Sequence, residues 1–129
     1  MNSDLGTDLL NRNEVILYVS DQARARDFYA AVLAAEPSLD VSGMTEFDLG
    51  GTTLGLMPVA DMAALVPGIT AGSGQRCELY LRRPDAEAIL TTAAQAGGSV
   101  LSEVELRPWG EAVGYALDPD GHVLAVSRL

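Results

Sequence analysis

The sequence contains few of the residues on which common enzyme classes depend. Among 129 residues there is one cysteine, Cys77, and one histidine, His122. A single cysteine excludes an internal disulfide and any CxxC redox or zinc motif. The chain also has no G-x-S-x-G nucleophile elbow and no phosphate-binding glycine-rich loop. These absences exclude the usual motifs of serine hydrolysis, nucleotide binding and thiol chemistry.

Long apolar runs are also absent, so the sequence predicts no membrane span, which needs about 20 apolar residues. Residues 1–12, MNSDLGTDLLNR, lack the basic start and apolar stretch of a signal peptide, and we interpret them as a polar N-terminal arm. With so little cysteine, the sequence favours a cytoplasmic protein.

Basic and aromatic residues are scarce. Eight Lys and Arg residues against 18 Asp and Glu give a net charge of −10. Such a surface repels nucleic-acid phosphates and anionic lipids and favours cationic partners, although acidity alone also keeps a protein soluble. We therefore expect no nucleic-acid partner. Because only 5% of residues are aromatic, each aromatic side chain is more informative than usual.

Apolar residues form 48% of the chain and follow a pattern that occurs twice. Residues 14–21 alternate with period two, as in a strand that has two different faces. Asp21 is a suitable N-cap for a helix that ends before Pro37. Residues 47–57 predict two strands around a glycine turn. The predicted helix has an apolar stripe at i, i+3, i+4, i+7 and i+8: Ala25, Phe28, Tyr29, Val32 and Leu33.

The second half repeats this order. Residues 77–83 predict a strand, Pro84 suits the first turn of a helix, and Gly97-Gly98 ends that helix. Strands are expected at 99–106, 112–117 and 122–128, with Asp-Pro-Asp-Gly as the last turn. The second predicted stripe has the same spacing: Ala86, Ile89, Leu90, Ala93 and Ala94.

These elements predict an α+β fold of two βαβββ repeats, at residues 13–58 and 75–129, within one compact domain. Residues 59–74 form a linker with one helical turn at about 61–65. Each repeat has one helix, which covers one face of its curved mixed sheet. The other face is left concave and forms a cleft.

The motifs, in this order, resemble the vicinal oxygen chelate superfamily, which includes glyoxalase I, the bleomycin-resistance proteins and the extradiol dioxygenases. V-S-D followed by R-D-F-Y-A-A-V-L is similar to the family's strand–Asp–helix opening. R-C-E-L-Y-L, R-P-W-G and G-Y-A-L-D-P-D-G-H-V-L are similar to its closing strands. The resemblance covers about residues 13–128.

Enzymes of this family hold a divalent metal through the first and last strands of each repeat. The resemblance maps these positions to Glu14, Gly55, Glu78 and Ala125. Two carboxylates fall short of the three or more ligands, His among them, that a catalytic transition metal uses. We expect His122 on the face opposite Ala125, as a turn or packing residue. The sequence therefore predicts no metal and no other cofactor.

Without a metal, the resemblance implies the drug-binding branch, in which bleomycin-resistance proteins sequester a cationic glycopeptide in an acidic cleft of a dimer. We therefore expect a homodimer that binds a small molecule, with a cationic drug or metabolite as the favoured ligand. The expected ligand-binding residues supply negative charge or stacking surface: Glu14, Tyr18, Glu78, Tyr80 and Trp109. An ordinary hydrated sheet face would explain the same glutamates.

Other functions stay open. One is a metal-dependent lyase, isomerase or dioxygenase with an unorthodox site, and another is a non-catalytic dimeric scaffold. A third is metal-free proton transfer, in which Glu14 and Glu78 approach each other and repulsion raises one pKa. The sequence assigns no catalytic residue.

Overall fold

The structure, a computed structural model, describes residues 13–72, 74–75 and 77–129, so the expected polar arm at 1–12 lies outside the described residues. A helix, α3, lies between two βαβββ units, which confirms the predicted fold class. The elements in chain order are β1 (Asn13–Val19), α2 (Gln22–Leu33), β2 (Leu39–Val41), β3 (Met44–Asp48), β4 (Thr52–Pro58), α3 (Val59–Leu65), β5 (Glu78–Arg83), α4 (Ala86–Gln95), β6 (Ser99–Leu106), β7 (Ala112–Leu117) and β8 (Val123–Arg128).

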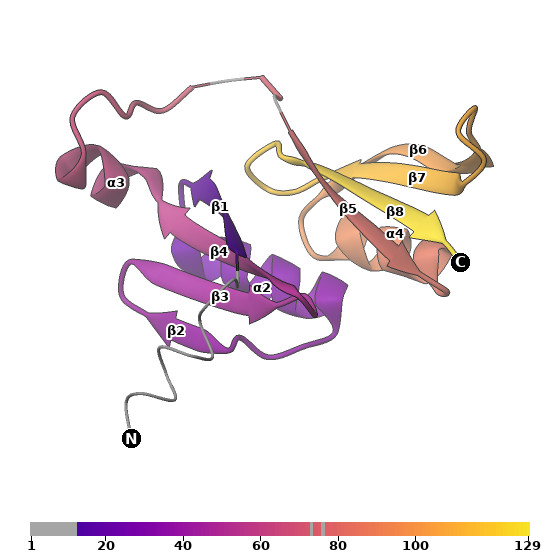
Figure 1. Cartoon of the computed structure of the whole chain (residues 1–129), viewed down its shortest axis with the longest axis horizontal. Helices are drawn as coiled ribbons and strands as arrows, with labels where there is room; N and C mark the ends of the chain where they lie inside the picture. Colours follow the sequence, from indigo (N-terminus) through magenta and orange to yellow (C-terminus); the bar gives the residue numbers. More distant parts are fainter. Residues whose placement is uncertain (1–12, 73, 76) are drawn as a thin grey trace.

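Each repeat forms one four-stranded mixed sheet, in the orders β1-β4-β3-β2 and β5-β8-β7-β6. The first strand of a repeat pairs in parallel with its last strand, and the other pairs are antiparallel. Helix α2 lies behind the first sheet and α4 behind the second, so the uncovered faces look the same way (Figure 1). We call them the first and the second open face.

The two helices contact each other, and both repeats contribute to one hydrophobic core. The predicted stripes supply it, because Phe28 and Tyr29 of α2 and Ile89 and Leu90 of α4 are buried. Ala94, which the spacing also placed in the stripe, is exposed. No helix in the described part of the chain is long and apolar enough to span a membrane.

The helix ends follow the sequence signals with one difference. Asp21 caps α2 as predicted, since its Oδ1 accepts from the Arg24 amide at 3.0 Å. The glycine stop of α4 is also confirmed, with Gly97 at a φ of 105°. Pro84, however, lies before the N-cap residue Asp85 rather than in the first turn, because α4 begins at Ala86.

The Asp-Pro-Asp-Gly turn between β7 and β8 forms hydrogen bonds with the first repeat. The Tyr29 hydroxyl of α2 donates to Asp118 Oδ2 at 2.7 Å, and both residues are buried. Ser20, at the end of β1, donates its amide and hydroxyl to Asp120 Oδ1 at 2.9 and 2.7 Å. The end of β1 and helix α2 are therefore hydrogen-bonded to the last turn of the second repeat, which holds the two repeats together.

Candidate functional site

The first open face carries a carboxylate that bends over a glycine. Glu14, Ile16 and Tyr18 are exposed on β1, as the alternation predicted. Ile16 and Glu46 lie on either side of Gly55 in the register of β1, β4 and β3. A β-carbon at position 55 would collide with Oε2 of Glu14. Glycine at this position therefore gives the Glu14 carboxylate the space that it occupies.

Glu14 forms a hydrogen bond with Glu46, which raises its affinity for a proton. Partial burial raises the pKa of Glu14 to about 7, together with the hydrogen bond to Glu46 and the charge of Glu46. Two carboxyl groups can form a hydrogen bond only if one of them carries a proton. The sequence suggested that Glu14 could approach Glu78. In the structure, the carboxyl group that Glu14 contacts is that of Glu46.

The second open face contains a different cluster, centred on Glu111. Its Oε1 accepts from Tyr80 Oη at 3.0 Å, Arg82 Nε at 3.0 Å and Ser127 Oγ at 2.7 Å. Its Oε2 accepts from Arg82 Nη2 at 2.9 Å. These hydrogen bonds, first from Arg82, then from Ser127 and Tyr80, lower the pKa of Glu111 to about 2. Glu111 is therefore ionised, and its oxygen atoms already accept hydrogen bonds from Tyr80, Arg82 and Ser127.

Tyr80 connects this cluster to Trp109. The Tyr80 hydroxyl donates to Glu111, so it accepts the indole Nε1–H of Trp109 at 3.1 Å. Trp109 is 55% exposed and is not part of the hydrophobic core. The structure thus brings two of the expected ligand-binding residues together and leaves the indole ring exposed to solvent, with its N–H hydrogen-bonded to Tyr80.

Arginine side chains lie over the rings of Tyr80 and Tyr115 on this face. The guanidinium carbon of Arg82 lies 4.9 Å from the ring centre of Tyr80, and that of Arg107 lies 5.2 Å from the ring centre of Tyr115. The pKa of Tyr115 is raised by burial and then by the charge of Glu78. Glu78 therefore acts on the second open face, whereas Glu14 acts on the first.

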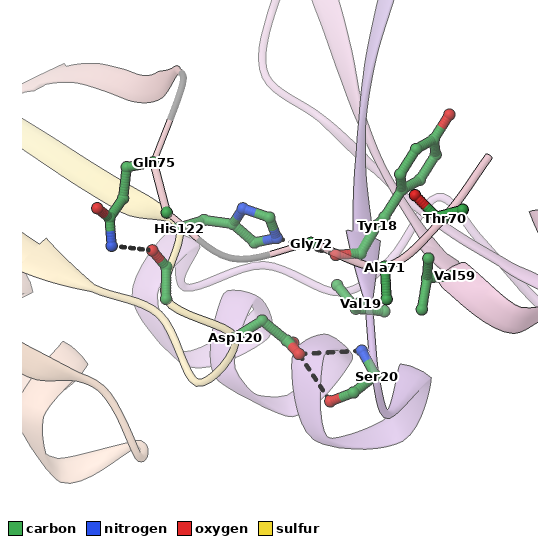
Figure 2. Close-up of a pocket in the computed structure, with 12 residues that line it drawn as sticks. Tyr18, Val19, Ser20, Val59, Thr70, Ala71, Gly72, Gln75, Asp120 and His122 are labelled. Atoms are coloured by element: carbon green, nitrogen blue, oxygen red, sulfur yellow. Dashed lines mark hydrogen bonds between the residues drawn. The ribbon is translucent and has the colours of Figure 1, made fainter. Parts of the chain in front are cut away.

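Tyr18, the remaining expected residue, lines a cavity of about 370 Å³ between the repeats (Figure 2). Other parts of its wall are Thr70–Gly72, Ser20 and the last turn of the second repeat. His122 lies at this junction and its Nε2 is 2.9 Å from the Tyr18 carbonyl oxygen, a turn position as expected. Tyr18 is thus separate from the Tyr80–Trp109 pair.

Sequence reasoning missed Glu46, Glu111 and the arginines. The register of the hairpin around Gly50-Gly51 places Glu46 opposite Gly55 and would have identified the acidic pair. No local pattern identifies Glu111, because its partners Tyr80, Arg82 and Ser127 are far away in the sequence.

The residues at the family's metal positions do not fit a transition metal. Gly55 and Ala125 have no ligand atoms, and the Glu14 carboxylate occupies the space that a longer side chain at position 55 would need. Glu14 and Glu78 act on separate faces, with Glu46 and Tyr115 as their neighbours. In the described residues there is no group of three or more His, Cys, Asp or Glu that suits a metal ion.

Solved structures with this fold are numerous. A glyoxalase-related enzyme from Fulvimarina pelagi is 21% identical, with 91% of this chain and 86% of that chain covered and a TM-score of 0.81. A glyoxalase/bleomycin resistance protein/dioxygenase family enzyme from Burkholderia phytofirmans PsJN is 16% identical, with 90% and 96% covered and a TM-score of 0.81. A hypothetical protein from S. aureus is 18% identical, with 91% of each chain covered and a TM-score of 0.79.

These identities show the fold alone, and no curated protein matches the sequence. The model of the Glyoxalase/Bleomycin resistance protein/Dioxygenase superfamily matches residues 11–126, which is most of the chain. The chain belongs to this superfamily.

Proposed function

We propose that this protein binds a planar small molecule on Trp109 at the second open face, without a metal. The observation that carries this proposal is the indole of Trp109, which is 55% exposed although its N–H is hydrogen-bonded to Tyr80, itself hydrogen-bonded to Glu111. Fixing a side chain costs conformational entropy, and an exposed ring gains little packing in return. A rigid exposed aromatic ring is the usual anchor of a recognition surface.

The chemistry of this face favours binding over catalysis. Glu111 has a pKa of about 2 and is paired with Arg82, so it does not act as a general base at neutral pH. The Tyr80 hydroxyl is engaged as both donor and acceptor. Neither group is available to move a proton of a ligand bound on Trp109.

The arginines of this face bear on the cationic ligand expected from the sequence. A cationic drug of the bleomycin type would meet the guanidinium groups of Arg82 and Arg107 beside the aromatic rings. Glu78 would attract it there, whereas Arg82 and Glu111 already form an ion pair with each other. Sequestration of a drug or metabolite stays our proposal for the biological role, but the arginines disfavour a cation.

Fluorescence of Trp109, the only tryptophan, tests the proposal. We expect saturable quenching by at least one member of a panel of cationic, neutral and anionic planar dyes. Tyr80→Phe removes the acceptor of the indole N–H and should weaken that dye about fivefold, the value of about one hydrogen bond. Tyr18→Phe is the matched control and should leave the affinity unchanged. Quenching that is linear, or equal in all three proteins, contradicts the proposal.

We also propose that the protein is a cytoplasmic homodimer. Val15 and Ile16, on the edge strand β1, are 52% and 41% exposed, and an exposed apolar edge favours pairing with another chain. Sedimentation equilibrium at micromolar concentration should give twice the chain mass, and a monomer mass contradicts the assembly.

A second candidate function is proton transfer by Glu14, favoured by its pKa of about 7 and its exposure on the first open face. Such a base removes a proton from a carbon acid. Solvent deuterium exchange into small α-hydroxyketones such as dihydroxyacetone, followed by NMR, should be catalysed by the wild type and lost in Glu14→Gln. Equal rates in the two proteins contradict this candidate.

A further inference from the structure

Arg107 differs from Arg82, its neighbour on the second open face, in its partners. The chain is acidic, with 18 Asp and Glu residues against 8 basic ones, so a carboxylate partner is easy to find. Four of the described arginines have one: Arg24, Arg26, Arg82 and Arg128. Arg83 donates to the main-chain carbonyl of Arg82 and forms no ion pair within the described residues. Arg107 also donates only to neutral acceptors and forms no ion pair in the described part of the chain.

Two of the three guanidinium nitrogens of Arg107 hold the β6–β7 hairpin together. Nε and Nη2 donate to the Val113 carbonyl at 3.0 and 2.8 Å. Nη2 also donates to the Glu103 carbonyl at 3.0 Å and to Ser102 Oγ at 2.8 Å. These contacts lie where the register of β6 and β7 shifts, so they explain a structural role for Nε and Nη2.

The third nitrogen, Nη1, has no acceptor among the described residues, although it carries two N–H groups. Arg107 is partly buried as a residue, and its guanidinium lies over the Tyr115 ring, which restricts its movement. A partly buried cation that has no counter-charge is unfavourable, and binding of an anion would stabilise it. The structural role of Arg107 therefore leaves a fixed cation with free donors.

The ion pairs of the described residues place no carboxylate against the guanidinium of Arg107. The carboxylate of Glu111 forms an ion pair with Arg82. Glu78 reaches Tyr115 through its charge, and it forms no ion pair with Arg107 within the described residues. Glu103 contributes its main-chain carbonyl and not its carboxylate to Arg107. A guanidinium with free N–H groups binds carboxylate or phosphate oxygens strongly.

We propose that Arg107 is the anion subsite of the ligand site, and that the ligand is a planar molecule with a carboxylate or phosphate group. This rests on the proposed function, because the ring of the ligand would lie on Trp109. Arg107 and Trp109 belong to one tight turn, closed by the Gly110 amide donating to the Arg107 carbonyl at 2.9 Å. A short aromatic acid is therefore the ligand class that reaches both.

Two-dimensional ¹H–¹⁵N NMR provides a signal at each end of this site: the indole Nε1–H of Trp109 and the Nε–H of Arg107. The probes are benzoate, phenyl phosphate, benzamide and benzylammonium, which share one ring and differ in charge. We expect benzoate or phenyl phosphate to shift both signals saturably, with benzamide and benzylammonium at least fivefold weaker. The stronger of the two anions identifies the natural group as a carboxylate or a phosphate.

The variants separate charge from structure. Arg107→Gln should weaken the better anion at least fivefold and leave benzamide unchanged. Arg107→Lys, which keeps the charge, should recover part of the affinity, and Arg83→Gln is the matched control in the same repeat. If Arg107→Gln does not fold, competition by inorganic phosphate against benzoate on the wild type gives the same information, since only an anion subsite is blocked by it.

Some results overturn the subsite. Benzamide binding as tightly as benzoate and phenyl phosphate does so, as does an equal loss of anion and benzamide affinity in Arg107→Gln. If benzamide shifts Trp109 while no anion binds more tightly, the anion subsite is wrong and the proposed function stands. If no probe shifts Trp109, both are contradicted.

Discussion

The two repeats have the same backbone plan and opposite chemistry on their open faces. In the first, Glu46 lies opposite Gly55, and in the second, Tyr115 lies opposite Ala125. At Gly55 the missing β-carbon lets the Glu14 carboxylate bend over the sheet to Glu46. At the corresponding place in the second repeat a methyl group lies between two tyrosines, Tyr80 and Tyr115. One register thus supports a proton-sharing acidic pair in one repeat and an aromatic cluster in the other.

The charges of the two faces differ accordingly. Partial burial and a neighbouring carboxyl group raise the pKa of Glu14 to about 7, while Arg82, Ser127 and Tyr80 lower the pKa of Glu111 to about 2. Duplicated sheets of this kind need only a few substitutions to specialise, because alternate side chains on a strand can change without disturbing the core on the other face.

The largest effect is expected where the repeats meet. Tyr29→Phe removes the donor to Asp118 Oδ2 and leaves a buried carboxylate oxygen without that hydrogen bond. A hydrogen bond to a charged group contributes about 1.5–3 kcal/mol, so urea denaturation should show a loss of about 2 kcal/mol in the free energy of unfolding. Tyr18→Phe serves as the control, with a change below about 0.5 kcal/mol. Equal changes in both variants would mean that the repeats are not joined through Asp118.

A smaller effect is expected at Gly55, the position where the first repeat has a glycine and the second has Ala125. Gly55→Ala places a methyl group against Glu14, Ile16 and Met44, with a cost of about 1–2 kcal/mol. It should also lower the pKa of Glu14 toward the ordinary range by displacing the carboxyl group from Glu46. Ala125→Gly is the matched change in the second repeat and should leave the pKa of Glu111 low. An unchanged Glu14 pKa in Gly55→Ala would show that the glycine is not what permits the pair.

The pH dependence of stability should also differ between the repeats. The folded state keeps the Glu14 proton that the unfolded chain releases, so this group makes stability fall as pH rises from 4.5 to about 7. Glu111 acts in the opposite sense, because its stabilisation is present above pH 4.5 and is lost as pH falls toward about 2. Since Glu14 is largely exposed, solvent screening limits its effect to about 1 kcal/mol.

Urea denaturation between pH 4.5 and 8 measures this dependence. Glu14→Gln should remove the decline between pH 4.5 and 7, and Tyr80→Phe, on the other face, should keep it. A decline that persists in Glu14→Gln would assign it to another group.

The fold was predictable because periodicity and turn residues act locally. The alternation in β1, the stripes of both helices and the Asp-Pro-Asp-Gly turn give each element without knowledge of its neighbours. The strand β2 (Leu39–Val41) has all its residues exposed and gave no such signal. Tyr80 and Trp109 were identified from the resemblance, but their connection through Glu111 depends on contacts between distant parts of the chain. Side-chain contacts of this kind follow from tertiary structure, so neither the composition nor the resemblance could supply them.

The most direct test of the division between the two faces is a ¹³C NMR titration of the glutamate side-chain carboxyl groups from pH 2 to 8. It needs no ligand and reads both faces in one experiment. The structure predicts that Glu14 titrates near pH 7 and Glu111 near pH 2. If both carboxyl groups instead titrate together near pH 4.5, the acidic pair and the Glu111 cluster do not exist as described, and the two faces do not differ in the way proposed.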